Sequence, residues 1–120
     1  MMLDFPKQRT QMVIAMKQGV QIPVNYEEDE IRNIVRIFKA LADPTRLRVV
    51  SALIEGRSIC VSDIAELLGM SISRVSHHLS ILDKLGFTRH KQDGKQVIYT
   101  ISDDCIVDIL ARAHEHVSGK

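Results

Sequence analysis

Residues 62–86 have the sequence SDIAELLGMSISRVSHHLSILDKLG, which contains two helical patterns separated by a glycine. Apolar side chains recur at three- and four-residue spacing in both halves, as they do on the buried face of an amphipathic helix. Gly69 and Gly86 follow the two patterns, and glycine commonly ends a helix. The stretch therefore predicts a short helix over 62–68, a tight turn, and a second helix over 71–85, which together form a helix-turn-helix.

The period of the pattern changes after Gly86. Residues 87–92 and 96–101 each alternate between two sets of side chains, which is the two-residue period of a β-strand. The dipeptide Asp93-Gly94 lies between these runs, and Asp-Gly in that position is a strong signal for a β-hairpin. A hairpin directly after a helix-turn-helix forms a wing. We therefore expect a mainly α-helical fold with a β-hairpin wing, that is, a winged helix-turn-helix.

Helical patterns also flank this centre. One runs over residues 27–41 and another over 44–56, where Asp43 is placed to cap the helix and Pro44 takes its first position. After the hairpin, Ser102 is expected to cap a last helix that runs to about residue 117.

Length and composition exclude several classes of protein. A chain of 120 residues is one domain, large enough to form a core without disulfides. Pro and Gly interrupt any pattern in residues 1–25, so we expect an N-terminal arm there and the winged helix-turn-helix domain over 26–118.

No apolar run is long enough for a membrane span, and no signal peptide is evident, so a cytoplasmic protein that does not contact membranes is expected. Cys60 and Cys105 lie far apart in the sequence, which argues against a disulfide scaffold and against a CxxC zinc site.

The net charge of +1 conceals an uneven distribution. Residues 71–95 hold five Lys and Arg against two Asp, a net charge of +3, whereas residues 96–120 have a net charge of −2. A local basic block suits the phosphate backbone of double-stranded DNA. Short hydroxyl side chains let a helix approach DNA closely, and Arg74 is able to reach guanine or phosphate. The side chains expected to face DNA are Ser71, Ser73, Arg74, Ser76, His77 and His78 on the second helix, with Lys91 and Lys95 on the wing.

Four motifs make the chain resemble the ArsR/SmtB family of winged helix-turn-helix repressors over about residues 28–117. They are ALADPTRLR at 40–48, ICVSDIA at 59–65, VSHHL at 75–79 followed by Leu82, and Gly94-Lys95 leading into Val97-Ile98-Tyr99. The resemblance implies transcription regulation by a homodimer that binds a palindromic operator and is released by an inducer. It also implies that the positions matching Ser73, Ser76 and His77, together with the wing, face DNA.

The resemblance implies that a metal-sensing site can lie in several places, and two of them are compared with this sequence. In one, a Cys-Val-Cys-Asp pattern at the start of the third helix is completed by cysteines in the N-terminal arm. Here that stretch is Cys60-Val61-Ser62-Asp63, and residues 1–25 contain neither Cys nor His. A soft-metal site at this place lacks most of its ligands.

The second place is the last helix, where the family pattern is Asp-x-His, ten residues, then His-x-x-Glu or His-x-x-His. This chain has Asp103-x-Cys105, ten residues, and His116-x-x-Gly119, so three of four positions hold a ligand. Cys105 and His116 are about 16 Å apart along a helix, so one chain cannot bring both to one ion. Two antiparallel copies of the helix could, with His114 as a rival or supplementary ligand, and the donor set suits Zn²⁺ or another divalent ion such as Cd²⁺. The apolar seam expected between the copies is Ile106, Ile109, Leu110, Ala113 and Val117.

Other interpretations of the same residues remain open. Asp103 and the two histidines also suit the ends of a helix, and Cys105 suits packing. Cys60 and Cys105 could instead make a repressor that responds to oxidants or reactive sulfur, as low-pKa thiolates or as a disulfide, and a repressor without a metal response is a further alternative. An enzyme is not expected, because no oxyanion site, phosphate loop or orienting group accompanies Cys60 and the histidines. A module that binds an acidic protein would differ from a repressor in not binding duplex DNA.

Overall fold

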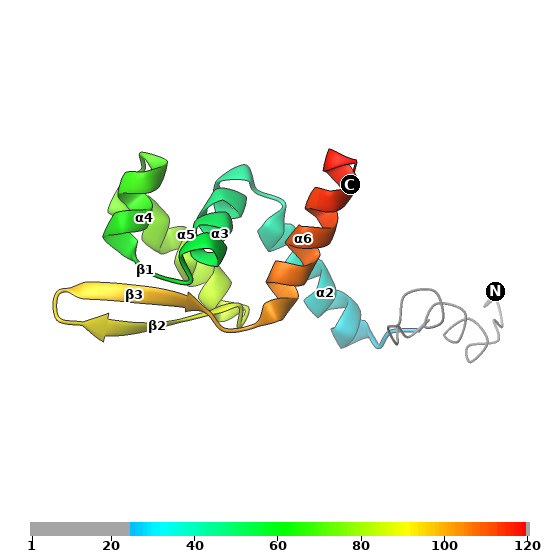
Figure 1. Cartoon of the computed structure of the whole chain (residues 1–120). Helices are drawn as coiled ribbons and strands as arrows, with labels where there is room; N and C mark the ends of the chain where they lie inside the picture. Colours follow the sequence, from blue (N-terminus) through cyan, green and yellow to red (C-terminus); the bar gives the residue numbers. More distant parts are fainter. Residues whose placement is uncertain (1–24, 120) are drawn as a thin grey trace. The chain divides into compact units, whose positions relative to one another are not determined.

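The computed structural model describes residues 25–119 and confirms a mainly helical winged helix-turn-helix fold (Figure 1). The residues fall into two units, one that ends at Arg36 and one that begins at Ile37. Residues 1–24 of the predicted arm lie outside the described part. The elements, in order, are α2 (Glu28–Leu41), α3 (Pro44–Gly56), β1 (Ser58–Cys60), α4 (Val61–Leu68), α5 (Ile72–Lys84), β2 (Thr88–Asp93), β3 (Gln96–Ile101) and α6 (Asp104–Ser118).

The helix-turn-helix consists of α4 and α5, and local capping sets its boundaries. Gly69 ends α4 with a left-handed φ of 64°, and the following Met70 N–H donates to the Ala65 carbonyl at 2.9 Å. Ser71 then caps α5, because its Oγ accepts a hydrogen bond from the Arg74 N–H at 3.2 Å. Both predicted helices are confirmed, with ends shifted by at most one residue.

The wing is the hairpin of β2 and β3, and its turn differs by one residue from the prediction. Asp93 pairs with Gln96, so the two-residue loop is Gly94-Lys95 rather than Asp93-Gly94. Gly94 has a φ of 63° and Lys95 does not have a positive φ. A positive φ at the first loop position alone is the requirement of a type II′ turn, which matches the twist of a hairpin.

A third strand was not predicted. β1 pairs antiparallel with β3, Ser58 opposite Thr100, and the sheet order is β1-β3-β2. Three residues are too few to show a strand period, and the pairing partner lies some forty positions further along the chain. β1 therefore exists because tertiary pairing with the wing satisfies its backbone.

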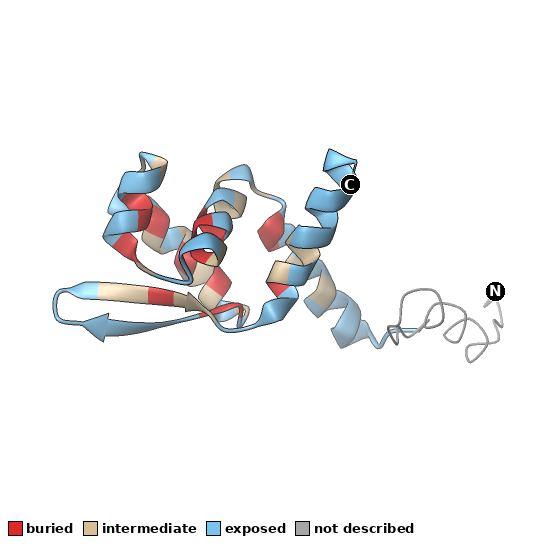
Figure 2. Cartoon of the chain, in the orientation of Figure 1, coloured by how far each residue is buried: buried red, intermediate tan, exposed pale blue. Residues whose placement is uncertain are grey.

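The core of the second unit is formed mostly by helical side chains, and Tyr99 joins it from β3 (Figure 2). Ile106 places the first turns of α6 in this core, whereas residues 111–118 of α6 are exposed. Ile81 of α5 is only half-buried. The largest side chains without solvent exposure are Leu53, Ile64, Leu79, Leu82, Ile106, Val49, Val50 and Val75.

The cap of α6 is Asp103 and not Ser102 as expected. The Asp103 Oδ1 accepts from the Cys105 N–H at 2.9 Å. Ser102 lies one residue too early and instead donates from its Oγ to the Gly86 carbonyl at 3.0 Å, which fastens the chain before α6 to the end of the helix-turn-helix. Within residues 25–119, every helix is too short or too polar to cross a membrane.

Candidate nucleic-acid interface

The first turns of α5 present polar and basic side chains to solvent. Ser71, Ser73, Arg74 and His77 are exposed, and Ser76 is half-buried. The hydroxyls of Ser71 and Ser73 lie 3.5 Å apart at the N-terminal end of the helix. These side chains form one exposed surface of short hydroxyls, one guanidinium and one imidazole, a composition able to donate to phosphates and to bases.

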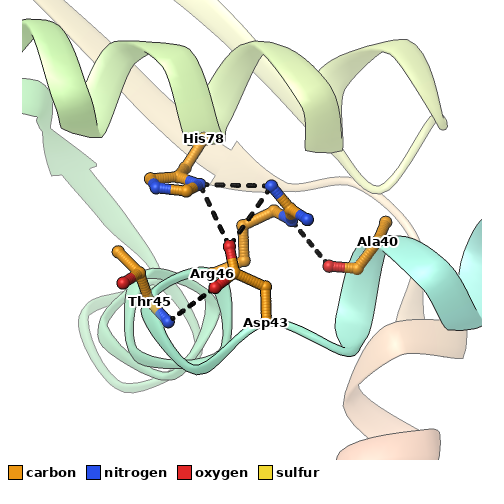
Figure 3. A network of polar contacts seen from close by, with 5 residues as sticks. All are labelled: Ala40, Asp43, Thr45, Arg46 and His78. Carbon is orange, nitrogen blue, oxygen red and sulfur yellow. Dashed lines mark hydrogen bonds and ion pairs between the residues drawn. The ribbon is translucent and has the colours of Figure 1, made fainter.

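His78 does not face outward, and that expectation was wrong. Its side chain is only 13% exposed and lies against the start of α3 (Figure 3). Arg46 Nη1 is 3.3 Å from His78 Nδ1 and 3.4 Å from Asp43 Oδ2, and Arg46 Nε donates to the Ala40 carbonyl at 2.6 Å. These contacts join α5, α3 and the last residues of α2.

The protonation state of His78 follows from this position. Burial lowers its pKa from the ordinary value, an effect that Asp43 opposes and that Arg46, His77 and Arg74 reinforce. The imidazole is therefore neutral at pH 7, and its Nδ1 accepts a hydrogen bond from Arg46. Asp43 Oδ2 lies 3.7 Å from His78 Nδ1, which is too far for a hydrogen bond. The main partners of the Asp43 carboxylate are therefore Arg46 and the Thr45 N–H, which donates to Oδ1 at 3.2 Å. The sequence predicted Asp43 as a helix cap, but nothing in the pattern indicated this second role.

A second network, also not predicted, joins the other end of α5 to the wing. The Asp83 carboxylate accepts from Thr88 Oγ1 at 2.7 Å and is hydrogen-bonded to His90 Nδ1 at 2.9 Å. The His90 ring stacks on Tyr99 with centroids 5.0 Å apart. Burial, with the nearby Asp83 charge, raises the pKa of Tyr99, so its hydroxyl remains protonated. The base of the wing is thus held at a fixed position relative to α5.

A hollow of about 440 Å³ lies between α5 and the wing. Ser76 contributes to it from α5, and Lys91 and Gln92 contribute from β2. Lys91 and Lys95 are both exposed, and Lys91 lines this hollow together with Ser76. The structure therefore places Lys91 of the wing and Ser76 of α5 around one hollow.

The candidate metal ligands of α6 are spread along one helix. Asp103 and Cys105 lie at its start, and His114 and His116 lie in its exposed second half. No group of three or more His, Cys, Asp or Glu side chains that could hold a metal ion occurs among the residues described here. Of the expected apolar seam, Ile106 packs into the chain's own core instead, whereas Val117 is 84% exposed.

The two cysteines are free thiols in different surroundings. Partial desolvation at the start of α6, together with the charges of Asp103 and Asp108, raises the pKa of the exposed Cys105 thiol, which disfavours a low-pKa thiolate at this position. Cys60 is buried, with its Sγ 3.3 Å from Ser62 Oγ at the start of α4. Where the family pattern has its second cysteine, this chain has Ser62, and the Ser62 hydroxyl is the partner of Cys60 Sγ.

Comparison with known proteins agrees with the fold and with these motifs. The model of the family described as bacterial regulatory protein, arsR family, matches residues 43–89, which span α3 to the first residues of the wing. A cadmium resistance transcriptional regulatory protein CadC homolog from Staphylococcus aureus is 32% identical over 84 residues, 70% of this chain and 69% of that protein. A transcriptional repressor SmtB homolog from Synechocystis is 32% identical over 108 residues, 89% of this chain and 81% of that protein.

A solved structure with the same architecture is that of the AntR antimony-specific transcriptional repressor. It superposes with a TM-score of 0.74 at 30% sequence identity, covering 87% of this chain and 94% of that one. Sequence similarity of this extent and structural similarity of this degree lead to one assignment. The chain belongs to the ArsR family of winged helix-turn-helix transcriptional repressors, whose members bind DNA and are not enzymes.

Proposed function

We propose that this chain binds a palindromic operator as a homodimer, with α5 in the major groove and the wing on the flanking backbone. The observation that carries the proposal is the exposed polar and basic surface of α5, which two side-chain networks hold at a fixed orientation to α3 and to the wing. Ser73, Ser76 and His77 would contact base edges, because the N-terminal part of such a helix enters the groove. Ser71 and Arg74 complete the surface.

Electrostatic attraction would supply most of the affinity. Arg74, Lys91 and Lys95 are exposed and lie on the two elements proposed to contact DNA. Each phosphate contact releases counterions, so affinity should fall steeply as salt concentration rises. His78 is excluded from this surface by its contacts with Arg46 and Asp43.

The test is binding of duplex DNA selected from a random pool by the wild-type chain. The Ser76→Ala, His77→Ala double variant should lose specific binding in fluorescence anisotropy and keep its far-UV circular dichroism spectrum and oligomeric state. The matched control is Ser118→Ala, which removes a serine hydroxyl from α6 and leaves the proposed metal ligands in place. Unchanged affinity of the double variant would refute this assignment of base contacts.

A dimer fits the apolar residues that the fold leaves exposed. Ile31, Val35 and Phe38 on α2 are 41%, 42% and 55% exposed, and Val117 on α6 is 84% exposed. Large apolar side chains grouped on one helix in this way mark an association surface. Phe38→Asp and Val117→Asp should each shift the mass measured by light scattering from two chains toward one.

We further propose that a divalent metal ion such as Zn²⁺ or Cd²⁺ acts as inducer at a site between two α6 helices. Cys105 and Asp103 of one chain and His116 of the other would hold it, with His114 as a supplementary ligand and Gly119 contributing no side chain. The supporting observations are that Cys105 and His116 are both exposed and that one continuous helix keeps them apart within a chain. Thiolate, imidazole and carboxylate together suit these ions, and a bound cation would stabilise the thiolate that the nearby carboxylates disfavour.

Metal binding would act on DNA through a difference in metal affinity between two dimer conformations. Native mass spectrometry with Zn²⁺ and with Cd²⁺ should show two ions per dimer, and Cys105→Ser and His116→Ala should each lose them. Cys60→Ser is the matched control for thiol removal and should bind as wild type does. If Cys105→Ser and His116→Ala bind both metals as tightly as wild type, the proposed site is wrong.

A further inference from the structure

The first residue of α5 is a large apolar side chain that the fold leaves unburied. Ile72 is 55% exposed, whereas Val75, Leu79 and Leu82 of the same helix are fully buried. Ile72 was not among the side chains expected to face DNA. Its exposure is therefore a property of the fold that the helical pattern did not predict.

Ile72 is the one large apolar side chain of α5 that is exposed, and it lies at the N-terminal end of the helix. Ser71 and Ser73 flank it with short side chains, and the Ser71 Oγ is occupied as the helix cap. Isoleucine is β-branched and so holds a restricted χ1 in a helix, which gives the exposed group a defined direction. A stiff apolar side chain thus projects from the part of the helix whose residues contact base edges in helix-turn-helix proteins.

Only one base presents an apolar group in the major groove. Thymine carries a C5-methyl there, whereas the other base edges present hydrogen-bond donors and acceptors. An isoleucine against those donors and acceptors would remove them from water without giving them a partner, which is unfavourable. Against a methyl group, the same side chain buries apolar surface on both sides.

We infer that Ile72 contacts the C5-methyl of a thymine in each operator half-site and so determines specificity for thymine at that position. The inference rests on the proposed function, because it requires α5 to enter the major groove. Leu67 on α4 is the other large exposed apolar side chain of the helix-turn-helix, at 65% exposure. The first helix of the motif crosses the backbone rather than the base edges, so Leu67 serves as a matched control.

The experiment replaces each thymine of the selected duplex, in both half-sites, by deoxyuridine, which removes only the methyl group. At one thymine per half-site, replacement should weaken wild-type binding about fourfold per half-site, the effect of one buried methyl-sized group. Ile72→Ala should bind the two duplexes equally, and Ile72→Val should show a smaller difference than wild type. Leu67→Ala should keep the full wild-type difference.

Two results would overturn the inference. One is that no thymine replacement weakens wild-type binding, and the other is that every such effect persists in Ile72→Ala. The proposed function survives both if Ser76→Ala with His77→Ala still loses binding. If the wild-type chain selects no duplex, the proposed function fails and this inference fails with it.

Discussion

Arg46 should be among the most sensitive surface-proximal positions of the chain, because it joins three segments through one side chain. Its guanidinium contacts the Ala40 carbonyl, the Asp43 carboxylate and the His78 imidazole, and the side chain is only 16% exposed. Arg46→Ala removes all three contacts at once. The Ala40 carbonyl and His78 Nδ1 are then left without their partner in a partly buried place.

The size of the effect can be worked out from these contacts. A hydrogen bond with a charged group contributes about 1.5–3 kcal/mol, and a stranded buried acceptor costs about 1–3 kcal/mol. Folding of the variant no longer carries the entropy cost of ordering the arginine side chain, which offsets up to about 2 kcal/mol of this loss. We expect Arg46→Ala to lower the free energy of unfolding by about 2–3 kcal/mol. Arg46→Lys keeps the charge but not the planar fork, so it should fall between Ala and wild type.

Urea denaturation at one fixed chain concentration measures these differences, since dimer stability depends on concentration. Arg112→Ala is the control: Arg112 lies 3.6 Å from Glu115 but is 86% exposed, so its loss should change the free energy by no more than about 0.5 kcal/mol. Arg46→Ala should also bind the selected duplex more weakly under conditions where it is fully folded, because α5 is no longer fastened to α3. Equal destabilisation by Arg46→Ala and Arg112→Ala would refute this role of the network.

Three further predictions concern pH, capping and salt. Because the pKa of His78 is lowered in the folded chain, the unfolded chain binds more protons there once the pH falls below about 6.5. Stability rises with pH wherever the unfolded state binds more protons, so the free energy of unfolding should fall as pH drops from about 6.5 through the folded pKa. His78→Asn should flatten that decline in denaturation curves at pH 7.5 and 5.5, and an unchanged slope would contradict the contact. Asp103→Ala removes the cap of α6 and should cost about 1 kcal/mol by denaturation, more than Asp104→Ala, which removes no cap. Lys91→Ala and Lys95→Ala should each reduce the slope of log affinity against log salt by about 1 in anisotropy titrations, and slopes equal to wild type would remove the wing from the interface.

Local signals located most of the elements correctly. Gly69, Ser71 and Gly86 act within one helical turn of their own position, so the ends of α4 and α5 follow from the residues near them. The hairpin was also predictable, because Asp-Gly between alternating runs is a short-range pattern. Its turn was misplaced by one residue because the register depends on pairing along the whole length of β2 and β3.

Long-range contacts explain what those signals missed. β1 forms only because Ser58 and Thr100 are brought side by side, and a three-residue segment carries no period of its own. Helical spacing assigned His78 to the exposed face, but packing against α3 buries most of its side chain. Helical spacing made no assignment for Ile72, and packing leaves its side chain exposed. The spacing of Cys105 and His116 indicated that any shared ion needs two chains, and that follows from the rise of a helix alone.

The residues alone therefore defined the family, the order of helices and wing, and the basic segment, since each depends on short-range chemistry or on charge. The start of α3 decides which polar side chains of α5 are available to a partner. Arg46 and its neighbour Asp43 contact His78 and so remove it from the exposed face, although about thirty residues of sequence separate them. A polar residue on a helix is compatible with solvent, with DNA or with a buried partner, and its own sequence neighbourhood is the same in all three cases. Contact with another element is what distinguishes them.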